Sequence, residues 1–402
     1  MFESKAAMMI SAFSTQPPTF ASDREFDLLV NCCRWPVSPA AHERIHRESI
    51  TIDWPRFERL ALRHRVEGLV WPVLAGAAVE VPAEIARRLK ERAFQIARQN
   101  LLAAAECKRL RDAFAGAGID LLFIKGLTVA VLAYGSIMPK AASDVDVLIA
   151  PEALLPACDI FRQLGYQPLL PTAGDEIALT QWHAVSKESI WLGADGSMLE
   201  LHTSLADHPE LIPSIGVGSA RQSVEVANDI QLETLARNEL FAYLCVHGAS
   251  SAWFRLKWLA DLAALLAGSD QTETSGLYDR AVGLGAGVPA AAALILAHRL
   301  FGVAVDQEQL RDWMRRPAVR LLVHASVKSL TGARGEVELQ QVPLGTVWIH
   351  LAQLGMIPSA KGKLSEARRQ LLISKMSRQD GKTLTAGTRT ASAVSARRGW
   401  RR

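Results

Sequence analysis

The stretch from residue 121 to residue 148, LLFIKGLTVAVLAYGSIMPKAASDVDVL, constrains the fold of this chain most strongly. It reads as an apolar strand ending at Lys125-Gly126, a short helix, and a second strand that carries Asp144 and Asp146. Alternate side chains of a strand point to the same side, so the two carboxylates should lie together. Neighbouring carboxylates repel each other unless a cation neutralises them, and oxygen ligands of this type suit Mg²⁺ or Mn²⁺. The pattern therefore predicts a metal-dependent phosphoryl or nucleotidyl transfer site.

Glu200 is a candidate third carboxylate for this site. We expect strands over residues 182–192 and 197–203, joined by Gly-Ala-Asp-Gly, and the Asp-Gly pair is a good hairpin signal. Such a hairpin could place Glu200 beside the Asp144 strand, and two-metal chemistry needs two or three converging acids. The alternative is that Asp-Val-Asp only alternates on a half-exposed sheet, but its apolar neighbours Val145, Val147 and Leu148 favour an interior strand.

The junction Lys125-Gly126-Leu127-Thr128 is a candidate phosphate-binding turn. Glycine allows close approach of the backbone, and the start of a helix offers free N–H groups and a positive dipole end. Thr128 could cap the helix or contact phosphate, and Lys125 could supply charge. A plain tight turn is the alternative, and the Gly-x4-Gly-Lys pattern of a P-loop is absent.

Three further polar residues have two interpretations each. His202 shares a strand face with Glu200, so it could touch phosphate, orient the acid, or be an ordinary core histidine. Lys257 lies four residues before Asp261 on an expected helix, where the two could form an intrahelical ion pair or serve nucleotide binding. Trp253 and Trp258 are expected in the core rather than as a stacking platform.

Charge and composition restrict the compartment and the partners. The net charge is +4, but residues 375–402 carry a surplus of +7, so the rest of the chain carries −3. A mildly acidic body argues against a protein that coats nucleic acid, although the basic tail leaves such a contact open. Five cysteines without metal-ligand spacing favour a reducing, cytoplasmic location. No window reaches the roughly 18 apolar residues of a membrane span.

The order of the patterns predicts an α+β fold, with a small mixed-sheet core between N-terminal and C-terminal helical regions. We expect strands over residues 119–124 and 143–149, and helices over 83–115 and 231–266. The expected division is a flexible arm (1–24), a helical region (25–118), the α/β core (119–206), a helical domain (207–373) and a basic disordered tail (374–402).

Several motifs in this order resemble those of a known family. They are Phe123-Ile-Lys-Gly126, Tyr134-Gly135, Lys140 four residues before Asp144-Val-Asp146-Val-Leu148, Leu199-Glu-Leu-His202, His247, and Leu256-Lys-Trp-Leu-Ala-Asp261. The chain is thus similar, over roughly residues 25 to 265, to the bacterial uncharacterised nucleotidyltransferase family, whose fold is that of DNA polymerase β. The upstream segment Leu62-Arg-His-Arg-Val66 also fits the helical prelude of that family.

The resemblance implies roles for individual residues. Asp144, Asp146 and Glu200 would bind Mg²⁺ or Mn²⁺, and a group of residues would contact the nucleoside triphosphate, with ATP expected first: Lys125, Gly126, Thr128, Lys140, His202 and Lys257. The reaction would move a nucleoside monophosphate to an unidentified acceptor and release pyrophosphate. Two departures concern substrate binding: the hydroxyl beside the glycine is displaced to Thr128, and Lys140 stands where arginine is common.

Two other functions remain open at this point. One is a non-catalytic nucleotide- or peptide-binding protein with the same fold. The other is a toxin-like enzyme that modifies tRNA ends, against which the acidic body argues.

Overall fold

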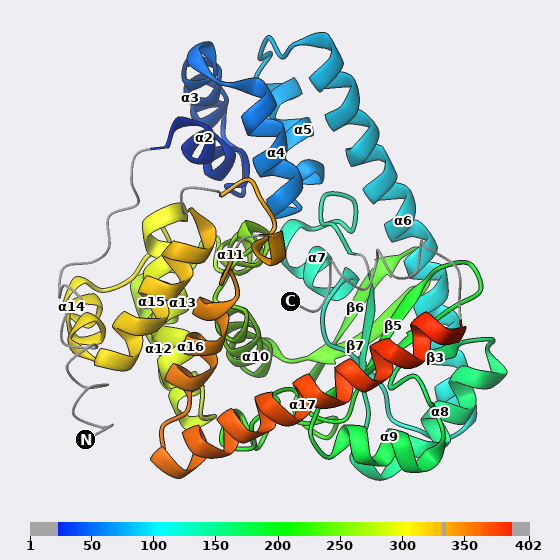
Figure 1. Ribbon diagram of the computed structural model, residues 1–402. Helices are drawn as coiled ribbons and strands as arrows, with labels where there is room; N and C mark the ends of the chain where they lie inside the picture. The colour runs from blue at the N-terminus through cyan, green and yellow to red at the C-terminus, as the bar shows by residue number, and fades with distance from the viewer. Residues whose placement is uncertain (1–22, 143, 332–334, 342, 388–402) are drawn as a thin grey trace.

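The computed structural model describes residues 23–142, 144–331, 335–341 and 343–387 (Figure 1). A mixed five-stranded sheet forms the centre of the core, in the order β1–β2–β5–β4–β3. The strands are β1 (Leu122–Phe123), β2 (Val145–Leu148), β3 (Gln167–Leu170), β4 (Glu188–Leu192) and β5 (Met198–His202). β2 and β5 run parallel, and the other neighbours pair antiparallel. With helices on both sides in the chain, this confirms the α+β class.

The two faces of the sheet differ in polarity. Val145, Val147, Leu199 and Leu201 form one buried face, which packs in a hydrophobic cluster with residues of α6 (Ala83–Gly116) and α8 (Leu154–Gln163). The other face carries the polar side chains that alternate with them along β2 and β5. This alternation places the site on one side of the sheet, and the apolar packing of the opposite side holds the strands in register.

Helices of the N-terminal region form a layer beyond one end of the core (Figure 1). They are α2 (Arg24–Cys32), α3 (Pro39–Glu48), a 3₁₀ turn η1 (Ser49–Thr51), α4 (Trp54–His64) and α5 (Glu67–Gly76). α6 follows and runs from this layer down to the sheet, as the prediction of a helix over residues 83–115 required. Its Asn100 side chain donates to the carbonyls of Ile137 and, at 2.8 Å, Lys140. The long helix therefore fixes the loop that precedes β2.

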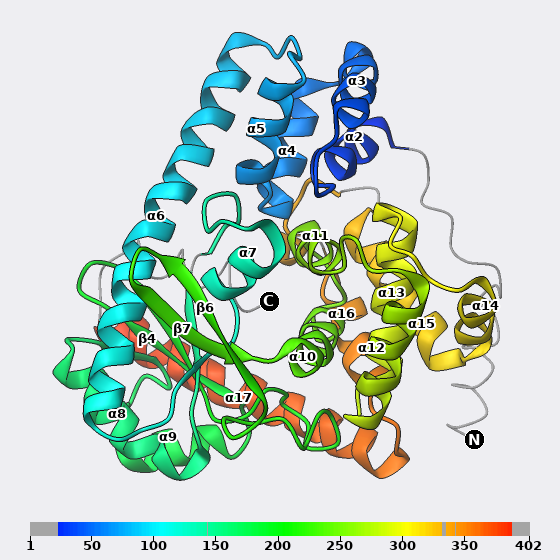
Figure 2. The same ribbon diagram turned by 180° about the vertical axis from the view of Figure 1, so that it is seen from behind.

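The core contains the short helix α7 (Leu127–Tyr134), the 3₁₀ turn η2 (Pro151–Ala153), α8 and α9 (Glu176–His183). A separate antiparallel hairpin, β6 (Arg221–Ala227) with β7 (Ile230–Leu235), lies beside α6 and α7 (Figure 2). Val224, Val226 and Leu232 of this hairpin join the same apolar cluster as β2. The hairpin thus extends the packed core beyond residue 206.

The described part of the C-terminal region, from residue 237 to residue 387, is mainly helical. Its helices are α10 (Arg237–Ser250), α11 (Leu256–Leu265), α12 (Gln271–Gly283), α13 (Gly287–Phe301), α14 (Gln307–Arg315), α15 (Pro317–Leu330), the 3₁₀ turn η3 (Leu339–Gln341), α16 (Val347–Met356) and α17 (Ala360–Gly387). α17 crosses the molecule toward the sheet, where Met376 packs against Leu170 and Ile190 (Figure 1). Trp253 is buried and Trp258 packs against the same cluster, as expected for core residues. Among the described residues, no helix is both long and apolar enough to cross a lipid bilayer.

Three expected elements were wrong. The strand expected over 182–192 starts as the end of α9, whose Trp182 donates its indole N–H to the Glu188 carbonyl, and β4 begins only at Glu188. The helix expected over 231–266 begins as β7, where the buried inward position is filled by the polar Thr234, so the alternation was hidden. The strand expected over 119–124 is reduced to Leu122–Phe123.

The expected division of the chain stays a prediction. The arm expected at 1–24 falls almost wholly outside the described residues, as does the end of the tail, 388–402. α17 runs past residue 373, where the helical domain was expected to end, so the tail expected to be disordered from residue 374 begins within a helix.

Gly248 in α10 offers a test of the packing. A Cβ atom at this position would lie 2.3 Å from Trp253 Cη2, and Trp253 is only 1% exposed. Gly248→Ala should therefore lower the free energy of unfolding by about 1–3 kcal/mol, because the ring has no room to move. Denaturant unfolding followed by circular dichroism measures the change.

Gly276 in α12 is the matched control. No described atom lies within 4 Å of a Cβ placed there, so Gly276→Ala should raise the free energy of unfolding by about 0.5–1 kcal/mol through helix propensity. Equal stabilities of the two alanine variants would contradict the packing described here.

Candidate active site

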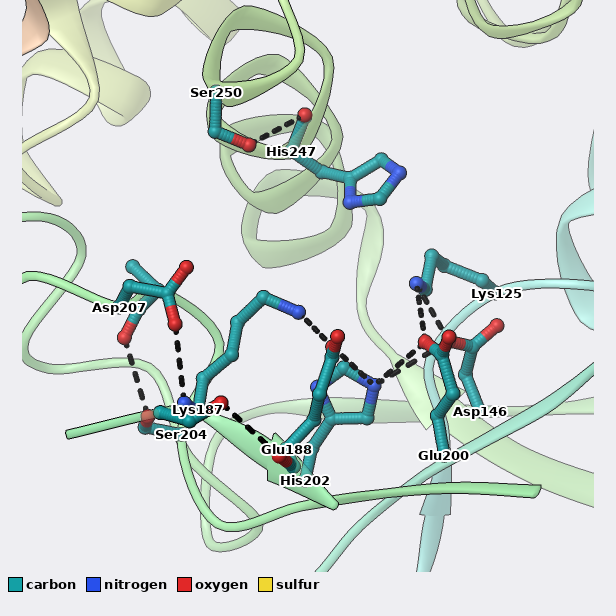
Figure 3. Close-up of polar contacts among 12 residues, drawn as sticks. Lys125, Asp146, Lys187, Glu188, Glu200, His202, Ser204, Asp207, His247 and Ser250 are labelled. Atoms are coloured by element: carbon teal, nitrogen blue, oxygen red, sulfur yellow. Dashed lines mark hydrogen bonds and ion pairs between the residues drawn. The ribbon is translucent and has the colours of Figure 1, made fainter. Parts of the chain in front are cut away.

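A compact polar group lies on the face of the sheet opposite α6 and α8. Its centre consists of Asp146 on β2 and Glu200 and His202 on β5, whose potential ligand atoms all lie within 4.8 Å of one another. All three side chains are buried. Figure 3 shows them converging from the two strands, with Lys125 beside them.

Strand register brings these residues together. In the parallel pair β2–β5, Asp146 lies opposite Glu200 and Leu148 opposite His202. In the antiparallel pair β5–β4, His202 lies opposite Glu188. Because residues paired across strands project to the same face, three carboxylates and one imidazole meet there.

His202 is surrounded by all three carboxylates. Its Nε2 atom lies 3.3 Å from Asp146 Oδ1, 3.5 Å from Glu188 Oε2 and 3.6 Å from Glu200 Oε2. Burial and the charge of Lys187 act to lower the pKa of His202, but hydrogen bonds to Asp146 and Glu200 and the charge of Glu188 outweigh them and raise it. The arrangement therefore favours an imidazolium in the metal-free site.

Lys125 also contacts the acids. Its Nζ atom lies 2.5 Å from Asp146 Oδ1 and 3.6 Å from Glu200 Oε2. Burial acts to lower the pKa of Lys125, but the charges around it, Asp146 foremost, keep it well above its ordinary value. Burial acts in the opposite sense on Asp146, whose pKa is nevertheless lowered, mainly by Lys125. The lysine expected to face phosphate is thus placed against the carboxylates.

Glu188 and Lys187 belong to this group and were missed in the sequence. The ammonium of Lys187 contacts the Glu188 carboxylate, and the Lys187 backbone N–H donates to Asp207 Oδ1 at 3.1 Å. Burial acts to raise the pKa of Glu188, but Lys187, His202 and Lys125 together lower it. The signal available in the sequence was the spacing of Glu188, Ile190 and Leu192, which lie on one face of a strand that begins at residue 188.

Helix α10 covers this polar group with Tyr243 and His247. The Tyr243 hydroxyl is buried and has no hydrogen-bond partner among the described residues. Burial raises the pKa of Tyr243. The positive charges of Lys125 and Lys187 act in the opposite sense, but burial outweighs them. Burial, Lys125 and Lys187 together lower the pKa of His247 well below its ordinary value. This buried hydroxyl can still donate or accept a hydrogen bond.

Asp144 lies at the rim, directly before β2. It is half-buried and is not a member of the Asp146–Glu200–His202 group. Its pKa is raised, first by burial and then by the charge of Glu200, while Lys125 and Lys257 act to lower it. Asp144 therefore shares the electrostatic environment of the group without belonging to its most compact part.

A second basic group stands beside Asp144. Lys140 Nζ lies 3.1 Å from Asp261 Oδ2, and the Tyr134 hydroxyl donates to Asp261 Oδ1 at 2.9 Å. Lys257 Nζ donates to the Ala141 carbonyl at 3.3 Å. Asp261 is thus the partner of Lys140, not of its helix neighbour Lys257 as one interpretation held.

Lys257 is the most perturbed cation of this second group. Its burial, together with the charges of Lys140 and Arg65, lowers its pKa to about 7. Arg65 ends α4 with a left-handed backbone (φ 54°), and no role for it was predicted. Lys140 is paired with Asp261, whereas Lys257 lies among other cations, an environment that an anion would stabilise.

The turn between β1 and α7 brings the backbone of Gly126 close to that of Asp144. Gly126 has φ 67°, which favours glycine, and a Cβ there would lie 3.6 Å from the Asp144 carbonyl oxygen. Thr128 is fully buried, and its hydroxyl lies 3.2 Å from the carbonyl oxygens of Phe123 and Lys125. Its hydroxyl therefore secures the turn. Of the two roles expected for Thr128, capping the helix or contacting phosphate, contact with the triphosphate stays a prediction.

The donor set fits a divalent metal. Two carboxylates and one imidazole nitrogen within 4.8 Å are ligands that Mn²⁺ accepts readily, and the carboxylates suit Mg²⁺. The Nδ1 atom of His202 is buried without a hydrogen-bond partner among the described residues, while Nε2 faces the carboxylates.

Comparison with known proteins identifies a family. A family described as "Uncharacterised nucleotidyltransferase" matches residues 51–302, from the start of α4 to the end of α13. No curated protein matches the chain.

Two single substitutions should move the pKa of His202 in opposite directions. Glu188→Gln removes a negative charge 3.5 Å from Nε2 and should lower it, whereas Lys187→Met removes a positive charge and should raise it. The pKa of His202 is higher in the folded than in the unfolded protein, so protonation of this ring stabilises the fold at low pH. That stabilisation is lost as the pH rises through the pKa of His202 in the folded protein.

Ring ¹⁵N chemical shifts over about pH 5–9, in metal-free buffer, report the titration. His202→Gln assigns the signal, and His46 on α3 serves as an internal reference. Shifts in the same direction in both variants, or none, would contradict this electrostatic description.

Proposed function

The chain belongs to the uncharacterised nucleotidyltransferase family, and from this membership we propose that it moves a nucleoside monophosphate from a nucleoside triphosphate to an acceptor in a metal-dependent reaction that releases pyrophosphate. The observation that carries the proposal is the buried group of Asp146, Glu200 and His202, with ligand atoms within 4.8 Å of one another. ATP is the nucleotide we propose first. The acceptor would be a small molecule, a peptide or a protein.

The proposed roles follow from the positions of the side chains. Asp146, Glu200 and His202 would hold a divalent ion, with Asp144 completing the set from the rim. Such an ion neutralises phosphate charge and lowers the pKa of an attacking hydroxyl. Burial of these ligands excludes water from the reacting groups, which strengthens every electrostatic contact made there.

The triphosphate would lie between the first turn of α7 and the second basic group. Gly126 permits close approach of the backbone, and the N-terminal end of α7 offers N–H groups to an anion. Lys257 of α11 acts on Asp144, whose carbonyl oxygen lies beside Gly126, and Lys140 belongs to the loop before β2 that Lys257 also contacts. Their charges would hold the phosphates while the metal ligands act on the reacting one.

The cellular setting is proposed from the cysteines. All five are unpaired and buried, as a reducing, cytoplasmic compartment would allow.

Loss of the carboxylates should abolish transfer. Asp146→Asn and Glu200→Gln should each reduce transfer of label from α-³²P NTP in the presence of Mg²⁺ or Mn²⁺ by about 10²–10³-fold, since each removes an anionic ligand of the proposed metal ion, which stabilises the reacting phosphate. Product formation and pyrophosphate release are both measured. Asp159→Asn is the control, because this carboxylate is 64% exposed and pairs only within α8 with Arg162.

The same assay separates the alternatives. Labelling of added tRNA would favour the toxin-like enzyme, and metal-independent nucleotide binding that survives both substitutions, without turnover, would favour the non-catalytic protein. Equal turnover in Asp146→Asn, Glu200→Gln and Asp159→Asn would refute the proposed site.

Nucleotide binding should be accompanied by proton uptake at Lys257. With a pKa of about 7, this amine is largely neutral at about pH 8, and a neighbouring phosphate would raise the pKa and charge it. The γ-phosphate is already deprotonated at that pH, so it does not release a compensating proton. Calorimetric titration with α,β-methylene-ATP in two buffers of different protonation enthalpy measures the uptake.

Lys257→Met should reduce this uptake, whereas Lys90→Met, at an exposed position of α6, should leave it unchanged. An observed binding enthalpy that is the same in both buffers for the unmodified protein would argue against Lys257 as a phosphate ligand.

A further inference from the structure

The ammonium of Lys125 stands where a cation shared by Asp146 and Glu200 would stand. Its Nζ lies 2.5 Å and 3.6 Å from their carboxylate oxygens, and Figure 3 shows the side chain directed into the group. The Lys125 side chain is 14% exposed, so water screens these contacts poorly.

The carboxylates of the site already have cationic partners without an added ion. Lys125 contacts Asp146 and Glu200, and Lys187 contacts Glu188. A divalent ion added to this arrangement would face the ammonium of Lys125 at close range. Its binding is therefore opposed as long as Lys125 stays on Asp146.

The two lysines differ in how they are held. The ammonium of Lys187 contacts Glu188. The backbone N–H of Lys187, directly before β4, donates a hydrogen bond to Asp207. Lys125 contacts the two metal ligands themselves, and it immediately precedes Gly126, the cap of α7. A triphosphate at the start of α7 would offer the flexible Lys125 side chain a stronger anionic partner a short distance away.

The unsatisfied Tyr243 hydroxyl is a second acceptor near Lys125. It is fully buried, has no partner among the described residues, and lies on the helix that covers the site. The ammonium therefore has polar groups to move to when it leaves Asp146.

We propose that Lys125 is an exchangeable counter-ion, which neutralises Asp146 and Glu200 in the nucleotide-free protein and passes to the triphosphate when nucleotide binds, so that the divalent ion enters together with the nucleotide and not before it. This inference rests on the proposed function, because it takes Asp146 and Glu200 as metal ligands. It adds an order of binding, and a positioning role for Lys125 in setting that order.

Binding of Mn²⁺ alone tests the first half. Free Mn²⁺ is counted by its electron paramagnetic resonance signal in nucleotide-free samples. Lys125→Met should bind Mn²⁺ at least about tenfold more tightly than the unmodified protein, because the competing cation is gone. Lys187→Met, which removes an equally buried lysine of the same group, should change the affinity by less than about threefold.

Lys125→Arg keeps the cation and can grip a carboxylate with two N–H groups, so it should bind Mn²⁺ no more tightly than the unmodified protein. A variant that misfolds loses affinity, so the gain expected for Lys125→Met is not a folding artefact, and circular dichroism checks each variant.

Binding of the Mn²⁺ complex of α,β-methylene-ATP tests the second half. The unmodified protein should bind the complex far more tightly than Mn²⁺ alone, and Lys125→Met should lose about tenfold in affinity for the complex while gaining affinity for the ion. Equal Mn²⁺ affinities of Lys125→Met and Lys187→Met would overturn the inference, as would tight Mn²⁺ binding by the unmodified protein without nucleotide.

Glu200→Gln distinguishes this failure from failure of the proposed function. If Mn²⁺ binds tightly to the unmodified protein and Glu200→Gln abolishes that binding, the metal site stands and only the exchange is refuted. If Glu200→Gln binds Mn²⁺ as well as the unmodified protein, or no variant binds it with or without nucleotide, the metal site itself is refuted.

Discussion

Parallel pairing of β2 with β5 is the interaction on which the rest of the site depends. It places Asp146 against Glu200 and sets His202 one step further along the same face. A slip of one residue would turn these side chains into the apolar layer and expose Val145 and Val147 to the charges. The packing of that layer against α6 and α8 fixes the register, so the hydrophobic side of the sheet determines the chemistry of the polar side.

The helical regions hold the groups that the sheet cannot supply. α6 fixes the loop before β2 through Asn100, α11 brings Lys257 to the same loop, and α10 covers the polar face. Close approach between α5 and this loop is allowed by Gly68, where a Cβ atom would lie 2.4 Å from the Pro139 carbonyl oxygen. The site is therefore built from segments on both sides of the core in the sequence, in agreement with a family match that extends from α4 to α13.

Local alternation in the sequence was enough to predict the acids of β2 and β5, because each lies in a short strand with apolar neighbours. Glu188 escaped this reasoning because the indole of Trp182 helps to end a helix where an uninterrupted strand had been expected. Hairpin β6–β7 escaped it because Thr234 fills an inward position. The position of Lys125 against Asp146, and the pairing of Lys140 with Asp261, depend on contacts between elements, which no local pattern encodes.

The two basic groups complement each other in the proposed reaction. A nucleoside triphosphate with one divalent ion carries a net charge of about −2, so the site binds it best when positive charge lies close to the phosphates. Transfer of Lys125 from the carboxylates to the phosphates adds no charge, but it places an ammonium beside the phosphates while the metal takes its place on Asp146. Protonation of Lys257, whose pKa of about 7 leaves it partly neutral beforehand, adds one positive charge. On this argument the buried charges cost little in the free protein, because each is paired or neutral, and they become available only when the nucleotide and its metal arrive together.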